Sequence, residues 1–167
     1  MKEYVLVVIK PDAMVKGLAG HILTRFSRSD LELVGAKLLK VSKQLAKQHY
    51  AHLKGKLFYQ EAVDYLLGKF HHFNKVLALV YVCEQAIHKC REIIGATNPE
   101  TATPTSIRGA YGRITTKGIF ENLIHASSDL HEAEREIKLW FSPHEIQEEL
   151  YPTKEISQKK EKRKIWA

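Results

Sequence analysis

The chain has 167 residues, which is enough for one domain with a substantial core and too few for two ordinary domains. Its hydrophobic content of 44% and charged content of 27% are ordinary for globular proteins, which excludes an intrinsically disordered chain and a membrane-embedded one. More than half of the formal net charge of +7 lies in residues 153–167, where six side chains are basic and two are acidic. We therefore predict one globular domain over residues 1–150 and a basic C-terminal tail over residues 151–167 that need not be ordered.

The apolar run at residues 4–9 is too short for a signal-peptide core or a membrane-spanning helix, so we expect a cytoplasmic protein that does not use a membrane. Cys83 and Cys90 lack the spacing of a metal motif and do not form a disulfide framework, and we predict that both are buried. His71 and His72 are adjacent and cannot face the same way in a regular element. Partly exposed loop histidines are therefore expected there rather than a metal site.

Strands and helices are expected to alternate along the chain. Residues 3–11 form an unbroken β-branched run that stops at a proline, which predicts a central strand buried on both faces of its sheet. Helical spacing follows at residues 18–29, strand-like alternation at 30–42, and Ser42 is a predicted N-cap. The later elements are helices over 43–53, 60–70 and 84–95, strands over 75–83 and 122–125, a turn-rich stretch over 97–118, and a last helix capped by Asp129. Four strands interleaved with helices predict an α/β sandwich, with a ferredoxin-like split βαβ arrangement and a four-stranded, mostly antiparallel sheet.

A histidine stands where the last strand ends and the last helix is about to begin, in the stretch IHASSD. In the helix that follows, Glu136 lies on or beside the apolar face, and a buried carboxylate needs a partner. His125 is one candidate partner, and Arg135 and Lys138 are two others. A carboxylate that orients an imidazole makes histidine a competent nucleophile, so the pairing with His125 is the one that predicts chemistry.

Four segments occur in this order: VVIKPDAMVKGLAG, HYAHLKGKLFY, REIIGATNPETATPTSIRG and ENLIHASSDLHEAEREIKLWF. There is no GxxxxGK loop, so a phosphate site has to use separate Lys and Arg side chains together with a metal ion. The set resembles the nucleoside diphosphate kinase family over roughly residues 4–150. The resemblance implies ping-pong transfer of the terminal phosphate of a nucleoside triphosphate to a nucleoside diphosphate through phosphohistidine, which maintains nucleoside triphosphate pools.

The resemblance also implies roles for individual residues. His125 would be the nucleophile, Ser127 and Glu136 would hold its imidazole, and Lys10 would stabilise the transferring phosphate. Phe58 would stack on the base, with an aliphatic side chain opposite it, and stacking accepts any base. Mg²⁺ would bridge the phosphates without a dedicated protein cage. The nucleotide-binding residues implied by the resemblance are Lys10, Tyr50, Phe58, Arg91, Thr97, Arg108, Ile119 and Asn122.

The chain departs from the usual family pattern in a few places. HASS replaces HGSD, which puts Ala126 and Ser128 beside the histidine, and RGA replaces RGD, with Ala110. Lys56 stands where arginine is common. About four extra residues precede the histidine motif, and we assign them to residues 115–118. None of these changes removes a matched catalytic residue, so an active enzyme is expected.

Two other functions remain as alternatives. The first is a regulatory protein on the same fold that binds nucleotide, or nucleic acid through the tail, and transfers phosphate poorly. The second is a histidine phosphorelay protein, which would not need Phe58 or the arginine cluster. Members of the family are homo-oligomers, hexamers or tetramers, and we favour the hexamer. The loop at residues 99–106 falls in the region that often packs between subunits.

Overall fold

The computed structural model describes residues 2–155. Four strands form a sheet in the order β2-β3-β1-β6, and each neighbouring pair is antiparallel. This order confirms the ferredoxin-like arrangement predicted from the sequence. The strands are β1 (Lys2–Ile9), β2 (Glu32–Lys40), β3 (Lys75–Glu84) and β6 (Ile124–Ala126).

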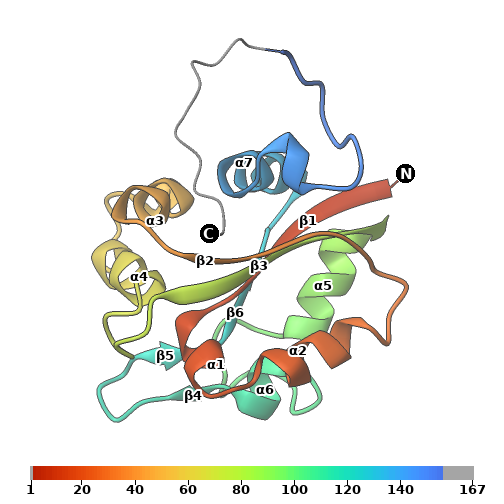
Figure 1. Cartoon of the computed structure of the whole chain (residues 1–167). Coiled ribbons are helices and arrows are strands. Elements are labelled where there is room, and N and C mark those ends of the chain that lie inside the picture. The colour runs from red at the N-terminus through yellow and green to blue at the C-terminus, as the bar shows by residue number, and fades with distance from the viewer. Residues whose placement is uncertain (1, 156–167) are drawn as a thin grey trace, which may run out of the picture.

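Helices cover both faces of this sheet (Figure 1). The first face carries α1 (Pro11–Val15), α2 (Ala19–Phe26), α5 (Ala86–Ile94) and α6 (Ile107–Tyr111). The opposite face carries α3 (Lys43–His49), α4 (Tyr59–Leu66) and α7 (Leu130–Trp140). Two single turns of 3₁₀ helix lie at Ala51–Leu53 and Pro143–Glu145.

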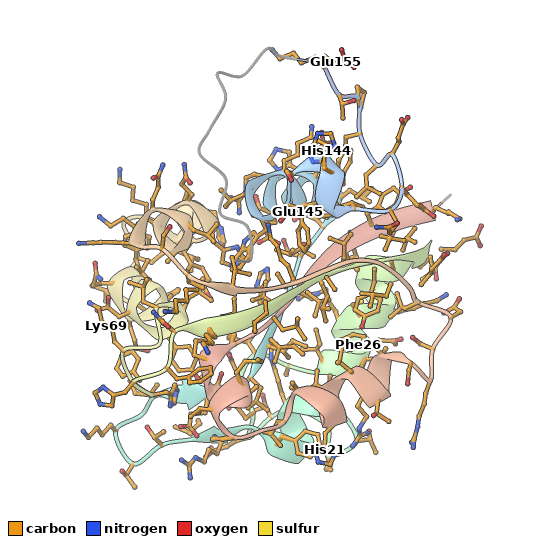
Figure 2. All side chains as sticks on the ribbon, in the orientation of Figure 1. His21, Phe26, Lys69, His144, Glu145 and Glu155 are labelled. Carbon is orange, nitrogen blue, oxygen red and sulfur yellow. The ribbon has the colours of Figure 1, made fainter. Side chains whose placement is uncertain are left out.

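The central strand β1 is buried on both faces, as its unbroken apolar run predicts. Every residue from Val5 to Ile9 is fully buried. Odd-numbered side chains join the core with α2 and α5, and even-numbered ones join the core with α3, α4 and α7, because successive strand residues point to opposite faces. In the first core, Phe26 of α2 stacks on Tyr81 of β3 with ring centroids 5.1 Å apart (Figure 2).

The short strand β6 pairs directly with the buried central strand β1. His125 pairs with Val8 in the antiparallel register. Just beyond it, the Ser127 N–H donates to the Leu6 carbonyl at 3.1 Å, and the Leu6 N–H donates to Ser127 Oγ at 3.2 Å. The backbone that carries the histidine is thereby fixed to the most buried strand of the protein.

Local signals in the sequence predicted two helix starts correctly, whereas the helices predicted over 18–29, 43–53 and 60–70 end earlier, at Phe26, His49 and Leu66. Ser42 Oγ accepts from the Leu45 N–H at 3.1 Å, and Asp129 Oδ1 accepts from the Glu132 N–H at 2.8 Å, so both predicted N-caps are confirmed. Cys83 and Cys90 are free and buried, as predicted.

One region differs from the expectation. The stretch predicted as turn-rich contains helix α6 and strand β4 (Arg113–Ile114), which pairs with β5 (Phe120–Glu121) in a hairpin. Elements of two to five residues leave too little periodicity to detect. His71 and His72 lie in a turn, the first partly buried and the second exposed, as predicted, and His71 Nδ1 lies 3.7 Å from Glu121.

Within residues 2–155, no helix has the length and hydropathy that crossing a bilayer requires. Most of the predicted basic tail, residues 156–167, lies outside the described residues.

Candidate active site

A buried pair formed by His125 and Glu136 lies at the centre of the site. The histidine is on β6 and the carboxylate on α7, the helix that follows β6 after a short turn. His125 Nε2 lies 2.9 Å from Glu136 Oε2. Because an ionised carboxylate only accepts hydrogen bonds, the ring donates from Nε2, and Nδ1 keeps its lone pair.

Ser127 completes the support of the histidine, since its hydroxyl donates to the same Glu136 oxygen at 2.6 Å. Of the other partners considered for Glu136, Arg135 approaches the second carboxylate oxygen at 3.7 Å. Lys138 pairs with Glu134 instead. The carboxylate, only 1% exposed, therefore has both a histidine and a serine donor.

His49 is a buried member of this cluster that the sequence analysis missed. Its ring lies edge-on to that of His125 at 4.4 Å, and its Nδ1 accepts a hydrogen bond from Trp140 Nε1 at 3.2 Å. Burial holds the pKa of His49 well below its ordinary value, so the ring is neutral. The dipeptide His49-Tyr50 was visible in the sequence, but the role of the histidine depends on a tryptophan 91 residues away.

The electrostatics favour a neutral histidine facing a polyanion. Burial, then the charges of Lys10 and Arg108, hold the pKa of His125 well below its ordinary value. Burial and then Arg108 lower the pKa of Lys10 to about 7. Burial also raises the pKa of Glu136, an effect opposed by its partners. Lys10, Arg91 and Arg108 line the same cavity, and their positive charges would attract a phosphate chain.

The guanidinium of Arg108 is fixed by backbone carbonyls on two segments. It donates to Gly95 O at 3.0 Å, Asn122 O at 3.2 Å and Ile124 O at 2.7 Å. These bonds use three of its five N–H groups and leave two for a ligand. Lys10 Nζ donates to Asn122 Oδ1 at 2.7 Å, which ties the second cation to the same segment.

The backbone before the histidine is strained. Leu123 has a φ of 65°, a left-handed angle that is rare for a branched side chain, and the Ile124 N–H donates to Asn122 O at 2.7 Å across it. Buried Asp12 holds this turn, because its Oδ2 accepts from the Leu123 N–H at 2.9 Å. The Lys10 N–H donates to the Leu123 carbonyl at 2.8 Å.

These residues surround a cavity of about 550 Å³. All the residues predicted for the site line it except Ser127, which lies behind Glu136, and Ile119. The neighbour of Ile119 along the hairpin, Phe120, lines the cavity instead, as does Phe58.

Three further predicted residues complete the wall. Burial raises the pKa of Tyr50, so its hydroxyl stays protonated and can donate. Arg91 of α5 is exposed at the cavity, and the Thr97 carbonyl accepts from Asn122 Nδ2 at 3.2 Å.

The departures from the family pattern do not disturb this geometry. Ala126 is a strand residue, buried in β6, and Ser128 donates to the N-cap carboxylate of α7 at 2.7 Å. Ala110 and Lys56 are exposed. The extra residues 115–118 form the turn between β4 and β5.

One cluster among the described residues has metal-ligand chemistry: His49, His125 and Glu136 have donor atoms within 4.8 Å of one another. Two imidazoles and one carboxylate do not suit Mg²⁺, which prefers oxygen ligands. The donors are also engaged, since Trp140 bonds to His49 and Ser127 bonds to Glu136. The chemistry of this cluster therefore does not suit Mg²⁺.

Comparison with known proteins finds relatives along most of the chain. A model of the family "Nucleoside diphosphate kinase" matches residues 3–146. A nucleoside diphosphate kinase from Desulfitobacterium hafniense is 42% identical over 144 residues, which is 86% of this chain and 91% of the relative. One from Pyrococcus furiosus is 42% identical over 146 residues, 87% of each chain.

Solved structures agree as well. The transition-state mimic of the Borrelia burgdorferi nucleoside diphosphate kinase with vanadate and ADP has a TM-score of 0.79 at 30% identity, covering 90% of this chain and 93% of its own. The Halobacterium salinarum enzyme in complex with CDP has a TM-score of 0.79 at 34% identity, covering 87% and 91%. With this fold, this site and these relatives, the chain belongs to the nucleoside diphosphate kinase family.

Proposed function

We propose that this chain, a nucleoside diphosphate kinase, carries the transferred phosphate on Nδ1 of His125. The observation that supports this assignment most directly is the 2.9 Å hydrogen bond from His125 Nε2 to the buried Glu136 carboxylate. That bond selects the tautomer in which Nδ1 has a free lone pair. The lowered pKa of His125 keeps the ring neutral, and so nucleophilic, at neutral pH.

In the first half-reaction, Nδ1 attacks the terminal phosphorus of the triphosphate. The N–P bond forms as the P–O bond to the leaving diphosphate breaks. The ring keeps its Nε2 proton, so positive charge develops on the imidazole, and the Glu136 carboxylate stabilises it. A second diphosphate then takes the phosphate from His125 in the same cavity, which makes one site sufficient for donor and acceptor.

The cations position and stabilise the phosphates. Arg108 has two N–H groups left after its backbone contacts, which suits a bidentate bond to phosphate oxygens. Asn122, held by Lys10, is assigned to the sugar. The residues assigned to the phosphates are Lys10, Tyr50, Arg91, Thr97 and Arg108.

Nucleotide identity and the metal follow from the same site. The relatives solved with ADP and with CDP support one cavity that accepts purine and pyrimidine nucleotides, and stacking on Phe58 carries no base-edge code. Mg²⁺ is expected to bind with the nucleotide, where it would neutralise phosphate charge and orient the oxygens.

Two predictions remain beside the site. From the family resemblance we propose a homo-oligomer, with the hexamer favoured over the tetramer. The cytoplasmic location stays a prediction from the sequence. No observation on the described residues favours the regulatory-protein or phosphorelay alternatives.

The test is a two-step labelling experiment. The protein would be mixed with Mg²⁺ and γ-labelled ATP. One portion would be quenched in base and mapped by mass spectrometry, and GDP would be added to a second, unquenched portion. We expect base-stable, acid-labile label on His125 that moves to GTP. His125→Ala should bind ADP without taking label. If the wild-type protein binds nucleotide but takes no label, the regulatory-protein alternative takes the lead.

A further inference from the structure

We propose that Phe120, on the β4–β5 hairpin, forms an aromatic clamp with Phe58 and that the nucleotide base is held between the two rings. Both side chains line the site cavity, and the clamp places a second aromatic ring where the family resemblance puts an aliphatic residue. The inference deepens the proposed function and rests on it, because it concerns the base end of the same nucleotide site.

Alternation along the hairpin explains why Phe120, and not Ile119, reaches the cavity. In extended backbone, every second side chain faces the same way. Phe120 and Asn122, two residues apart, line the cavity, as does the turn residue Gly118, whereas Ile119 and Glu121 do not. Since Asn122 is bonded to Lys10 at the sugar end of the site, Phe120 stands two residues away on the same side.

The hairpin is anchored firmly enough to hold a ring in place. Glu121, only 4% exposed, accepts from Arg113 Nε and from Lys16 Nζ, each at 2.5 Å. The turn is closed by the Gly118 N–H donating to the Thr115 carbonyl at 2.8 Å. These contacts therefore fix the backbone of the hairpin that carries Phe120.

The second aromatic side chain at this cavity comes from a different element. Phe58 stands at the N-cap of α4, and Ala62 and Tyr65 of that helix also line the cavity. Phe58 is 53% exposed and Phe120 is 37% exposed. Large apolar side chains left open at one cavity mark a binding surface, and two aromatic rings that line it suit a flat heterocycle.

The test compares base-dependent and base-independent binding to the full-length protein. Isothermal titration would measure Kd for ADP, for CDP and for inorganic tripolyphosphate, which has no base. Phe120→Ala should weaken ADP binding about 5- to 100-fold, weaken CDP binding less because its ring is smaller, and leave tripolyphosphate within about twofold. Phe120→Trp should keep ADP binding.

Thr116→Ala, at an exposed position in the turn of the same hairpin, is the control and should leave all three affinities unchanged. If Ile119→Ala weakens ADP binding and Phe120→Ala does not, the clamp is wrong. Equal loss of ADP and tripolyphosphate in Phe120→Ala would also overturn it, because the hairpin and not stacking would then be at fault. If the wild-type protein binds neither ligand, the proposed function itself fails.

Discussion

Replacing Glu136 by glutamine tests the geometry around the histidine most directly. The change keeps the size of the side chain but removes its charge and half of its acceptor capacity. In the native site both His125 and Ser127 donate to one carboxylate oxygen. A glutamine oxygen at that position keeps both hydrogen bonds but has no charge. A glutamine NH₂ at that position faces both donors, and a ring that then accepts at Nε2 must carry its proton on Nδ1.

The size of the effect follows from those two bonds. A hydrogen bond to a charged partner contributes about 1.5–3 kcal/mol, and loss of the carboxylate removes that support from the positively charged ring in the transition state. We expect the rate of His125 phosphorylation to fall by about 10- to 150-fold. Nucleotide affinity should change little, because Glu136 is assigned to the histidine and not to the phosphates.

Rapid-quench measurement of phosphohistidine formation, with Kd for ADP measured in parallel, would separate the two effects. Glu134→Gln is the control, since this carboxylate lies on the same helix but is exposed and pairs with Lys138. A wild-type phosphorylation rate in Glu136→Gln would refute the argument that this carboxylate sets the tautomer. A loss confined to ADP affinity would refute the assignment of the residue to the imidazole.

Three other predictions use the same structure. The pKa of Lys10 is about 7 in the free protein, and bound phosphates should raise it, so nucleotide binding above pH 7 should take up close to one proton. Calorimetric titrations in buffers of different ionisation enthalpy would measure this proton uptake. No uptake at pH 8 would contradict the prediction. Asp12→Ala removes the hydrogen-bond acceptor of the Leu123 N–H and should lower the free energy of unfolding by about 1–3 kcal/mol. Urea titration would measure the change, and an unchanged unfolding midpoint would contradict the prediction. Gly109→Ala should lower the Tm, because the added Cβ would lie 2.0 Å from a backbone carbonyl oxygen. Gly20→Ala is the control and should keep or raise the Tm, because no atom lies within 4 Å of its added Cβ. Equal Tm values for the two variants would contradict the prediction.

The parts that were predicted from sequence depend on neighbours along the chain. The apolar run of β1, the caps at Ser42 and Asp129, and the histidine at the strand end are all local signals. His49 was missed because its partner, Trp140, is distant in sequence. A pattern cannot show which partner a buried imidazole will meet after folding.

The hairpin marks a second limit. A match to a family pattern placed Ile119 at the base, but the extra residues before it left the register undefined. A one-residue difference turns a strand side chain to the other face, and the structure puts Phe120 in the cavity wall. The residue type does not show which face of a strand a side chain occupies, because that is set by how the strand pairs in the folded protein.

Arg108 has a consequence for how variants of this protein are interpreted. Its guanidinium joins the loop after α5 to the segment that leads into β6, through carbonyls on both. Lysine has no planar fork with which to span them. A substitution of Arg108 would therefore remove contacts between two segments of the fold as well as the proposed phosphate contact. Lost turnover in such a variant would reflect lost stability as much as lost chemistry. The same side chain thus joins two segments of the fold and is the one proposed to bind phosphate, so local opening of this region would also disrupt the proposed site.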